Sequence, residues 1–264
     1  MIEYFIKEFF LIEVKILKAL KDNYVYLLHD PLSKQTAVID PSDEKVVLKE
    51  LKNLKRQLNY IFITHHHWDH IGGNLKLKEA TGCQIIGAKK DKMKIPGIDQ
   101  MLEEGDSFKF GDTRAEIIET PGHTKGSICW YFKDESILFT GDTLFSLGCG
   151  RLFEGTAKQM LESLQKIKNL PTETKIYCGH EYTLQNAYFA LSLDQDDQNL
   201  KDKIKDLEKI SKAQTPSIPS FLSEELLMNP FLKTDKPSLQ KKISPENLEE
   251  WEYFSLLRKM KDNY

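Results

Sequence analysis

Four of the seven histidines of this chain lie within six positions of one another, in the segment THHHWDH at 64–70. These four are His65, His66, His67 and His70. Together with Asp69 they offer imidazole nitrogens and a carboxylate, which suit borderline divalent ions such as Zn²⁺, Fe²⁺ and Mn²⁺. The segment directly follows the apolar run YIFIT, and open α/β sheets place their sites at the carboxyl ends of strands. The cluster therefore predicts a metal site, against the weaker alternative of a solvated loop with incidental histidines.

Three further candidate ligands each stand at the end of a predicted strand, just before a turn. They are His123 in TPGHT, Asp142 in FTGDTLF and His180 in YCGHEY. Singly, such a residue is more often a cap or a satisfied core group. A site for one catalytic metal needs three protein ligands and a water, so the whole set of five His and two Asp predicts a second metal ion.

The elements that must position these residues alternate from residue 14 to about 180. Strands are predicted for VKIL, NYVYLLH, TAVID, YIFIT, CQIIGA, SFKFG, AEIIET, SICWYF, ILFTG and KIYCG. Helices are predicted over 43–56, within GGNLKLKEATG, and over 156–170 with Thr156 as N-cap. If the strand YIFIT extends far enough, His65 and His67 point to the same side. The pattern predicts an α/β domain with two sheets.

The pattern changes after about residue 182, where strand signals vanish. Helices are predicted over 183–193, 196–213 and 244–262, the last with Ser244 as N-cap and Pro245 at its first position. Between them the stretch TPSIPSFLSEELLMNPFL predicts an ordered loop with one short helix. We therefore predict a catalytic domain over 1–182 and a helical domain over 183–264.

Composition excludes several classes of protein. With 264 residues, 40% hydrophobic and 29% charged, the chain can build a core, which excludes a disordered chain and a disulfide-stapled miniprotein. Lys plus Arg is 37 against 40 for Asp plus Glu, so no global nucleic-acid signature exists. No apolar run approaches the ~18 to 20 residues of a membrane-spanning helix.

The cysteines and the first residues bear on the compartment. The four cysteines are scattered without a CxxC pair, which predicts buried thiols and a cytoplasmic protein. The first segment, MIEYFIKEFFLIEVKIL, is interrupted by charges and lacks a small-residue cleavage site. We expect it to form an extra strand or an amphipathic segment on the domain.

The chain resembles the metallo-β-lactamase-fold hydrolases, whose signature is H-x-H-x-D-H followed by separate His, Asp and His. Within them it is most similar to the glyoxalase II (hydroxyacylglutathione hydrolase) family. The similar blocks, spread from about residue 12 to 262, are KDNYVYLL, ITHHHWDHIGGN, TPGHTKGSICW, FTGDTLFSLGCGRLFEGT, YCGHEYT, NPFL and RKMKD. The resemblance implies an αββα sandwich with a smaller C-terminal α-helical domain.

The same resemblance implies hydrolysis of S-D-lactoylglutathione and other S-2-hydroxyacylglutathiones to glutathione and a 2-hydroxy acid, the final step of methylglyoxal detoxification. It also divides the ligands into two sets with a bridge between them. One set is His65, His67 and His123, the other is Asp69, His70 and His180, and the bridge is Asp142. Two divalent ions, expected to be zinc with iron or manganese as alternatives, would lower the pKa of a bound water to about 7. Asp69 and Asp142 are the expected catalytic residues.

Two residues between the ligands, His66 and Trp68, are expected to point away, and His29 to be structural. By resemblance, the glutathione moiety is bound by Arg151, Tyr182, Arg258 and Lys261. Glutathione carries two carboxylates and one ammonium, so cations and phenols suit it. Some family members have a tyrosine where this chain has Phe153, which is expected to form a wall of the pocket. Taken singly, each cation is more often a solvated surface residue.

Other functions of the same fold remain as alternatives at this point. A persulfide dioxygenase would use a single Fe(II) and usually lacks the long helical tail, and a lactonase or β-lactamase is a further possibility. A nuclease is disfavoured by the acidic balance, and a non-catalytic glutathione- or metal-binding module by the complete ligand set. We expect a monomer with no nucleic-acid or membrane partner, whose helical domain closes over the site.

Overall fold

The computed structural model describes residues 12–264 of the chain. The predicted strand or amphipathic segment at the start falls largely on residues 1–11, which lie outside the described residues. Within 12–264, no helix combines the length and the apolar character that crossing a membrane requires. The four cysteines are all buried and unpaired.

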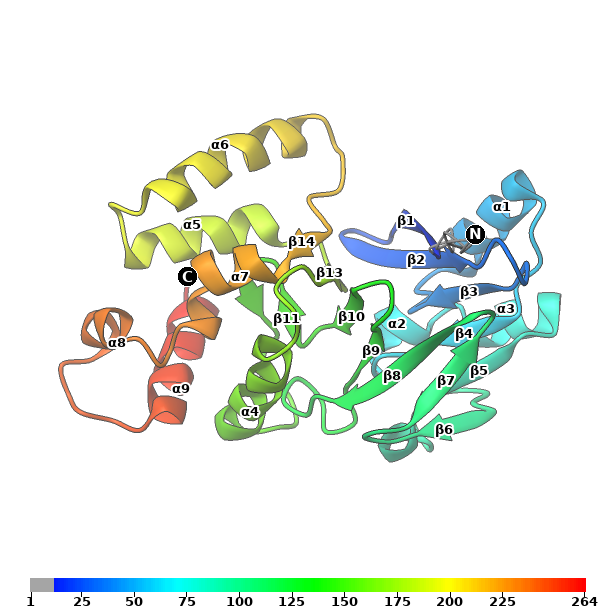
Figure 1. The fold of residues 1–264 in the computed structure, drawn as a ribbon, viewed down its shortest axis with the longest axis horizontal. Coiled ribbons are helices and arrows are strands. Elements are labelled where there is room, and N and C mark those ends of the chain that lie inside the picture. Colours follow the sequence, from blue (N-terminus) through cyan, green and yellow to red (C-terminus); the bar gives the residue numbers. More distant parts are fainter. Residues whose placement is uncertain (1–11) are drawn as a thin grey trace, which may run out of the picture.

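The first six strands form one sheet in the order β1-β2-β3-β4-β5-β6 (Figure 1). They are β1 (Glu13–Ala19), β2 (Asn23–His29), β3 (Thr36–Ile39), β4 (Tyr60–Phe62), β5 (Gln84–Ala88) and β6 (Gln100–Leu102). From β3 onward the pairing is parallel, so the residues that follow β3 and β4 come out at the same edge. The connections hold α1 (Glu44–Leu54), α2 (Trp68–Ile71), α3 (Asn74–Thr81) and the short η1 (Lys89–Asp91).

The second sheet has the order β14-β13-β10-β9-β8-β7. Its strands are β7 (Ser107–Phe110), β8 (Thr113–Glu119), β9 (Ile128–Phe132), β10 (Ile137–Gly141), β13 (Lys175–Cys178) and β14 (Ser220–Phe221). Strands β10 and β13 are parallel and are joined through α4 (Ala157–Lys168), so the residues after each reach one edge. A small hairpin, β11 (Leu144–Phe145) with β12 (Gly148–Cys149), lies between them in the chain.

The core of the sandwich lies between the two sheets and is rich in aromatic rings. Phe62 of β4 stacks on Trp130 of β9 with ring centroids 4.4 Å apart, and the Trp130 indole donates to the Ile63 carbonyl across the gap at 3.1 Å. A second cluster packs α1 and α3 on the outer face of the first sheet, and a third packs α4 on the second. This layering confirms the predicted αββα sandwich.

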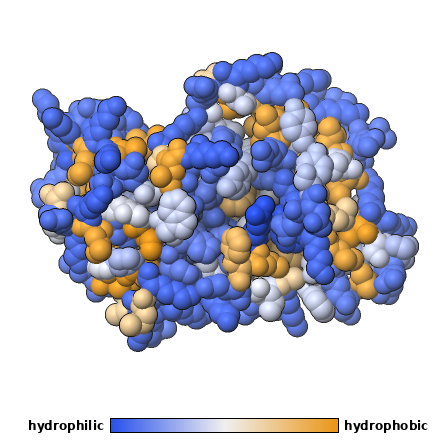
Figure 2. Space-filling view, turned by 180° about the vertical axis from the view of Figure 1, so that it is seen from behind, coloured by the Kyte–Doolittle hydropathy of each residue, from blue (hydrophilic) through white to orange (hydrophobic). Residues whose placement is uncertain are grey.

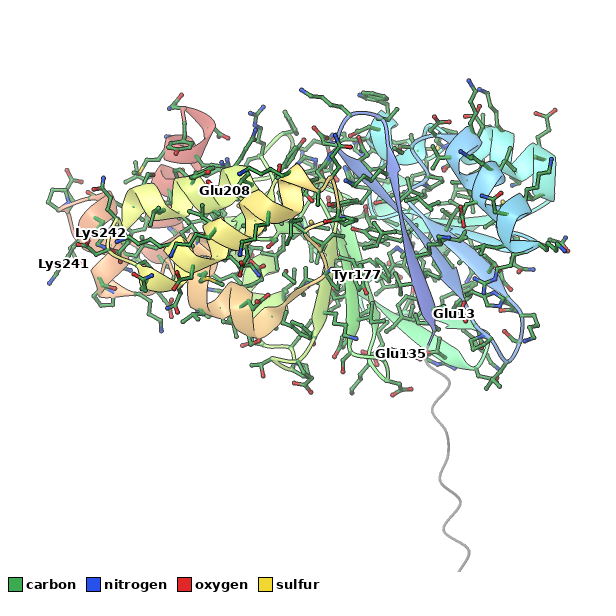
Figure 3. The ribbon with its side chains drawn as sticks, turned by 90° about the horizontal axis from the view of Figure 1, so that it is seen from above. Glu13, Glu135, Tyr177, Glu208, Lys241 and Lys242 are labelled. Carbon is green, nitrogen blue, oxygen red and sulfur yellow. The ribbon has the colours of Figure 1, made fainter. Side chains whose placement is uncertain are left out.

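The C-terminal part is helical, as predicted. It comprises α5 (Thr183–Leu193), α6 (Gln198–Lys212), α7 (Leu222–Met228), η2 (Pro230–Leu232), α8 (Pro237–Ile243) and α9 (Glu250–Asp262). Figure 3 shows it, with Glu208, Lys241 and Lys242, at the end of the molecule opposite to Glu13 of β1. The face of the molecule in Figure 2 is mainly hydrophilic, with scattered apolar side chains.

Two predictions about this part are wrong. The helix predicted over 244–262 begins only at Glu250, and Ser244 is instead the C-cap of α8. The Tyr253 hydroxyl donates to the Glu246 carbonyl, which ties the irregular segment before Glu250 to the helix α9. Strand signals were also expected to end before 183, yet Ser220–Phe221 pairs with β13 and extends the second sheet.

Candidate active site

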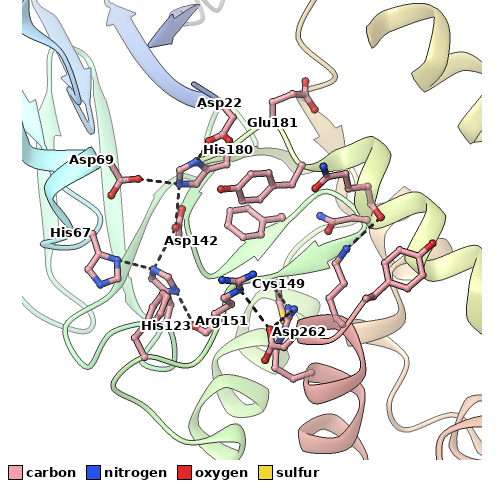
Figure 4. Close-up of a pocket in the computed structure, with 18 of the residues that line it drawn as sticks. Asp22, His67, Asp69, His123, Asp142, Cys149, Arg151, His180, Glu181 and Asp262 are labelled. Carbon is pink, nitrogen blue, oxygen red and sulfur yellow. Dashed lines mark hydrogen bonds and ion pairs between the residues drawn. The ribbon is translucent and has the colours of Figure 1, made fainter. Parts of the chain in front are cut away.

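The predicted metal ligands converge at the edge where β4, β8, β10 and β13 end (Figure 4). His65, His67 and His123 form one group. The Nδ1 atom of His67 lies 3.2 Å from Nε2 of His65 and 2.9 Å from Nε2 of His123. Ligands at about 2.0–2.1 Å from one tetrahedral ion lie roughly 3.3 Å apart, so these three nitrogens fit a common ion.

The second group comprises Asp69, His70 and His180. The Nε2 atom of His180 lies 3.4 Å from Oδ2 of Asp69, and Nε2 of His70 lies 3.7 Å from the same oxygen. The Asn23 amide donates to Oδ2 of Asp69 at 3.0 Å and thereby fixes the carboxylate. This group therefore offers two nitrogens and one oxygen to a second ion.

Asp142 lies between the two groups. Its Oδ2 is 3.4 Å from Nε2 of His123 and 3.3 Å from Nε2 of His180, while its Oδ1 is 3.5 Å from Nε2 of His70. One carboxylate thus faces ligands of both groups, which is the placement that a bridging residue needs.

Hydrogen bonds on the outer side of the histidines fix which nitrogen faces inward. His123 donates through Nδ1 to the Arg151 carbonyl at 2.8 Å, and His180 donates through Nδ1 to Asp22 at 2.9 Å. His70 donates through Nδ1 to Asp40, also at 2.9 Å. Each Nε2 therefore faces the inside of the site, an arrangement typical of metal-ligating histidines.

This arrangement gathers ring nitrogens and carboxylate oxygens closely around one point. The Nε2 of His70 and the Oδ1 of Asp142 are buried and have no hydrogen-bond partner. Buried polar atoms without partners are costly, and a cation between them satisfies both. The donor set therefore fits two divalent ions.

The pKa values of the histidines in the site shift in two directions, downward for His65 and His67 and upward for His180. Burial, together with the neighbouring imidazoles, lowers the pKa of His67 to about 4 and that of His65 well below its ordinary value, so these rings stay neutral. Burial also opposes the charged form of His180, but the Asp142 carboxylate outweighs it and raises the pKa to about 9. Burial of Asp142 is likewise outweighed, by His180 and His70, and its pKa is lowered well below the usual range. A metal ion would take the place of the proton on His180.

The backbone that carries His65, His67, Asp69 and His70 differs from the predicted strand. Strand β4 ends at Phe62, so it does not extend through His65 and His67. Instead, His67 is the N-cap of the one-turn helix α2, which places Asp69 and His70 in the site. At the strand end Asp40 holds Thr64, accepting from its backbone N–H at 2.8 Å and from its hydroxyl at 2.6 Å.

Three supporting residues were not predicted: Asp22, Asn23 and Asp40. Their only sequence signals are the turn KDN and the last residue of TAVID. Trp68 was expected to point away, but it is 73% exposed and lines the pocket beside the ligands. His66 does point away, toward Asp91, and His29 is bonded to Thr36 away from the pocket.

A cavity of about 1170 Å³ extends from these ligands to α5 and α9. All five predicted substrate residues line it: Arg151, Phe153, Tyr182, Arg258 and Lys261. The ring of Tyr182 stacks parallel on that of His180 with centroids 4.9 Å apart. The ring of Phe153 packs edge-on against His67 and His123.

The side chains of Arg151, Arg258 and Lys261 differ in their exposure and in the groups that they contact. Arg151 is two-thirds exposed and lies 3.7 Å from Asp262. Arg258 is buried, and its guanidinium donates to the Cys149 carbonyl at 2.7 Å and to Asp262 at 3.0 Å. Burial, together with Arg258 and Arg151, lowers the pKa of Lys261 to about 8.

Comparison with known proteins decides the family. Residues 21–180 match the metallo-beta-lactamase superfamily, and residues 181–264 match the hydroxyacylglutathione hydrolase C-terminus. A hydroxyacylglutathione hydrolase of Pelagibacter ubique is 48% identical over 252 residues, which cover 96% of this chain and 100% of the relative. The chain belongs to the hydroxyacylglutathione hydrolase family. Another member, from Methylococcus capsulatus, is 44% identical over 96% of this chain and 98% of its own length.

Solved structures agree on the fold of this hydroxyacylglutathione hydrolase family member. ETHE1 from Myxococcus xanthus has a TM-score of 0.65 and 25% identity, covering 93% of this chain and 95% of its own. The BLEG-1 B3 metallo-beta-lactamase has the same TM-score at 22% identity, covering 83% of this chain and 99% of its own, and shows the fold alone.

Proposed function

We propose that this chain hydrolyses S-2-hydroxyacylglutathiones, with S-D-lactoylglutathione as the type substrate, to glutathione and a 2-hydroxy acid in the final step of methylglyoxal detoxification. Its family membership makes it a thioester hydrolase. The observation that carries the proposal is that one cavity joins the complete His/Asp set to a wall of cations. Such a cavity suits a thioester whose remainder carries carboxylates.

We assign two divalent ions to the site, with zinc as the expected metal. One would be held by His65, His67 and His123, the other by Asp69, His70 and His180, with Asp142 between them. The inward-facing ring nitrogens and the central carboxylate support this assignment. TTHA1623 is a neighbour in fold at 27% identity and TM-score 0.55, covering 64% of this chain and 91% of its own, and it has been crystallised in a di-iron-bound form. When bound, the ions would polarise the thioester carbonyl and bring the pKa of water to near neutrality.

The chain's own groups orient the reactants. The Asn23 amide holds Oδ2 of Asp69, and we assign the other oxygen of this carboxylate to accept a hydrogen bond from the attacking water. Asp142 is buried and keeps its charge, so it offsets positive charge at the centre of the site. The departing thiolate is a good leaving group, so no further acid is assigned.

We assign the glutathione moiety to Arg151 and Lys261, with Tyr182 and Phe153 as aromatic walls. Arg258 would contribute its positive charge without being free to turn toward the substrate, because its guanidinium already binds the Cys149 carbonyl and the Asp262 carboxylate. All candidate metal ligands lie before residue 182, whereas Arg258 and Lys261 come from the helical region after it. This distribution supports a division into a catalytic part over 1–182 and a substrate-binding part over 183–264. A monomeric state stays a prediction.

Replacing Lys261 and Arg258 together by alanine tests this assignment. We expect KM for S-D-lactoylglutathione to rise about tenfold or more, the cost of lost hydrogen bonds to charged groups, while kcat and metal content stay near wild type. Lys261→Ala alone separates binding from packing, since Arg258 also holds the Cys149 carbonyl. Lys259→Ala, an exposed cation on the same helix and outside the pocket, is the control. An unchanged KM in the double variant would refute the assignment.

A further inference from the structure

The middle histidine of the run, His66, belongs to neither metal group, and hydrogen-bonding groups hold it on the other side of the segment. Its Nδ1 lies 2.9 Å from Oδ2 of Asp91, and its Nε2 lies 3.5 Å from Oε1 of Glu154. Only 15% of its side chain is exposed. Both ring nitrogens thus face carboxylates, each from a different part of the chain.

Asp91 is a fixed anchor for this ring. It is 1% exposed at the end of η1, and its backbone carbonyl accepts from Lys94 and Ile95 at 2.8 and 3.0 Å. The chain passes so close that a Cβ added at Gly126 would meet Oδ1 of Asp91 at 2.2 Å. The carboxylate therefore cannot move without displacing the chain around it.

Glu154 joins the same ring to the loop that carries the proposed substrate residues. Its Oε1 accepts from Lys94 Nζ at 2.8 Å, and its Oε2 accepts from the Lys125 backbone N–H at 2.8 Å. The backbone N–H groups of Phe153 and Glu154 both donate to the carbonyl of His123. The loop of Arg151 and Phe153 is therefore tied to two metal-binding segments at once.

We infer that His66 is a positioning residue that couples the metal-binding segment 65–67 to the substrate loop 151–154 through Asp91 and Glu154. The ring of Phe153 lies edge-on to that of His67, 5.5 Å between centroids, so a shift of the loop relative to the segment changes the wall of the pocket. The inference rests on the proposed function, because it takes Arg151 and Phe153 as contacts to the substrate.

Two substitutions separate the two contacts of His66. The amide of an asparagine lies near the position of Nδ1 and the amide of a glutamine near that of Nε2. His66→Asn therefore keeps the contact to Asp91 and loses that to Glu154, whereas His66→Gln does the reverse. We expect His66→Asn to raise KM for S-D-lactoylglutathione about three- to tenfold with full metal content. We expect His66→Gln to lower metal content, because the segment loses its anchor.

The coupling itself is tested with Glu154→Gln and the double variant His66→Asn/Glu154→Gln. Coupled residues give non-additive effects, so the double variant should show no higher KM than either single variant. Glu103→Gln is the matched control, since Glu103 pairs with Lys89 in the exposed surface outside the pocket, and it should leave KM and metal content unchanged.

Steady-state kinetics and metal analysis of the purified full chain distinguish the outcomes. Additive KM effects, or a KM of Glu154→Gln equal to that of Glu103→Gln, would overturn the inference. Should His66→Asn fail to fold, the comparison of the two glutamate variants decides alone. If wild-type protein with two metal equivalents hydrolyses no glutathione thioester, the proposed function fails instead, and the metal content of His66→Gln still tests the anchor.

Discussion

The inward-facing nitrogens of His70, His123 and His180 are set by what the other nitrogen of the same ring binds. His180 shows this most clearly, because Asp22 accepts from its Nδ1 at 2.9 Å while its Nε2 faces Asp69 and Asp142. Such outer partners orient a ligand and raise its basicity. They are part of the site although they would touch no metal.

Replacing Asp22 by alanine should therefore weaken metal binding. We expect the affinity for the ion at Asp69, His70 and His180 to fall about 10- to 100-fold, measured by competition with a chelator and by metal equivalents per chain. Asp206→Ala removes an exposed carboxylate far from the ligands, on α6, and should change nothing. Equal affinity in Asp22→Ala and wild type would contradict the role assigned to this hydrogen bond.

The lowered pKa of Lys261, about 8, predicts a pH dependence of substrate binding. Below that pH the side chain is an ammonium ion and attracts the carboxylates of glutathione, and above it the charge is lost. We therefore expect kcat/KM to fall as the pH rises past about 8. Arginine keeps its charge throughout this range, so Lys261→Arg should remove the descent. The same descent in Lys261→Arg would show that another group causes it.

The residues that come together in the two candidate metal groups could be predicted from the sequence, because His and Asp at strand ends are recognisable by type and spacing. Asp22 and Asp40 could not be predicted, since their role depends on rings more than twenty residues away in the chain. The burial of Arg258 against Cys149 is likewise a property of tertiary packing.

At the scale of elements, the regular ones were predictable and the shortest were not. Helix α4 has its apolar face and its cap in the sequence, and strands such as β9 are continuous apolar runs. Strand β14 is two residues long and α2 is one turn, and such segments show no periodicity. Both form because a neighbouring strand or a ligand set stabilises them.

Helix α4 provides a stability prediction for this scale. The Thr156 side chain accepts from the Gln159 backbone, and the Gln159 side chain accepts from the Thr156 N–H, which is a capping box. Thr156→Ala should lower the free energy of unfolding by about 1 kcal/mol, measured by denaturant titration. Ser244→Ala is a useful comparison, because Ser244 caps no helix N-terminus and the loss there should be smaller. A larger loss at Ser244 would contradict the observed helix boundaries.

In the molecule as a whole, both parts of the chain line the same cavity. The sandwich supplies all predicted ligands from the ends of its strands, whereas α5 and α9 supply Gln185, Arg258 and Lys261 to the same cavity. The two sheets and the helical part were predictable from periodicity, whereas the αββα layering was implied by the resemblance to a family. Their meeting at one cavity was implied only by the resemblance to a family, because periodicity does not report how two parts pack.

Hydrolysis of S-D-lactoylglutathione by the full chain loaded with two zinc ions is the direct test of the proposed activity. The loss of thioester absorbance should be compared with that of the lactoyl thioester of N-acetylcysteamine, which lacks the carboxylates and the ammonium of glutathione. We predict hydrolysis of both, with kcat/KM at least about tenfold higher for the glutathione thioester. Absence of hydrolysis with two metal equivalents bound would contradict the proposed activity, and equal kcat/KM for the two thioesters would contradict recognition of the glutathione moiety.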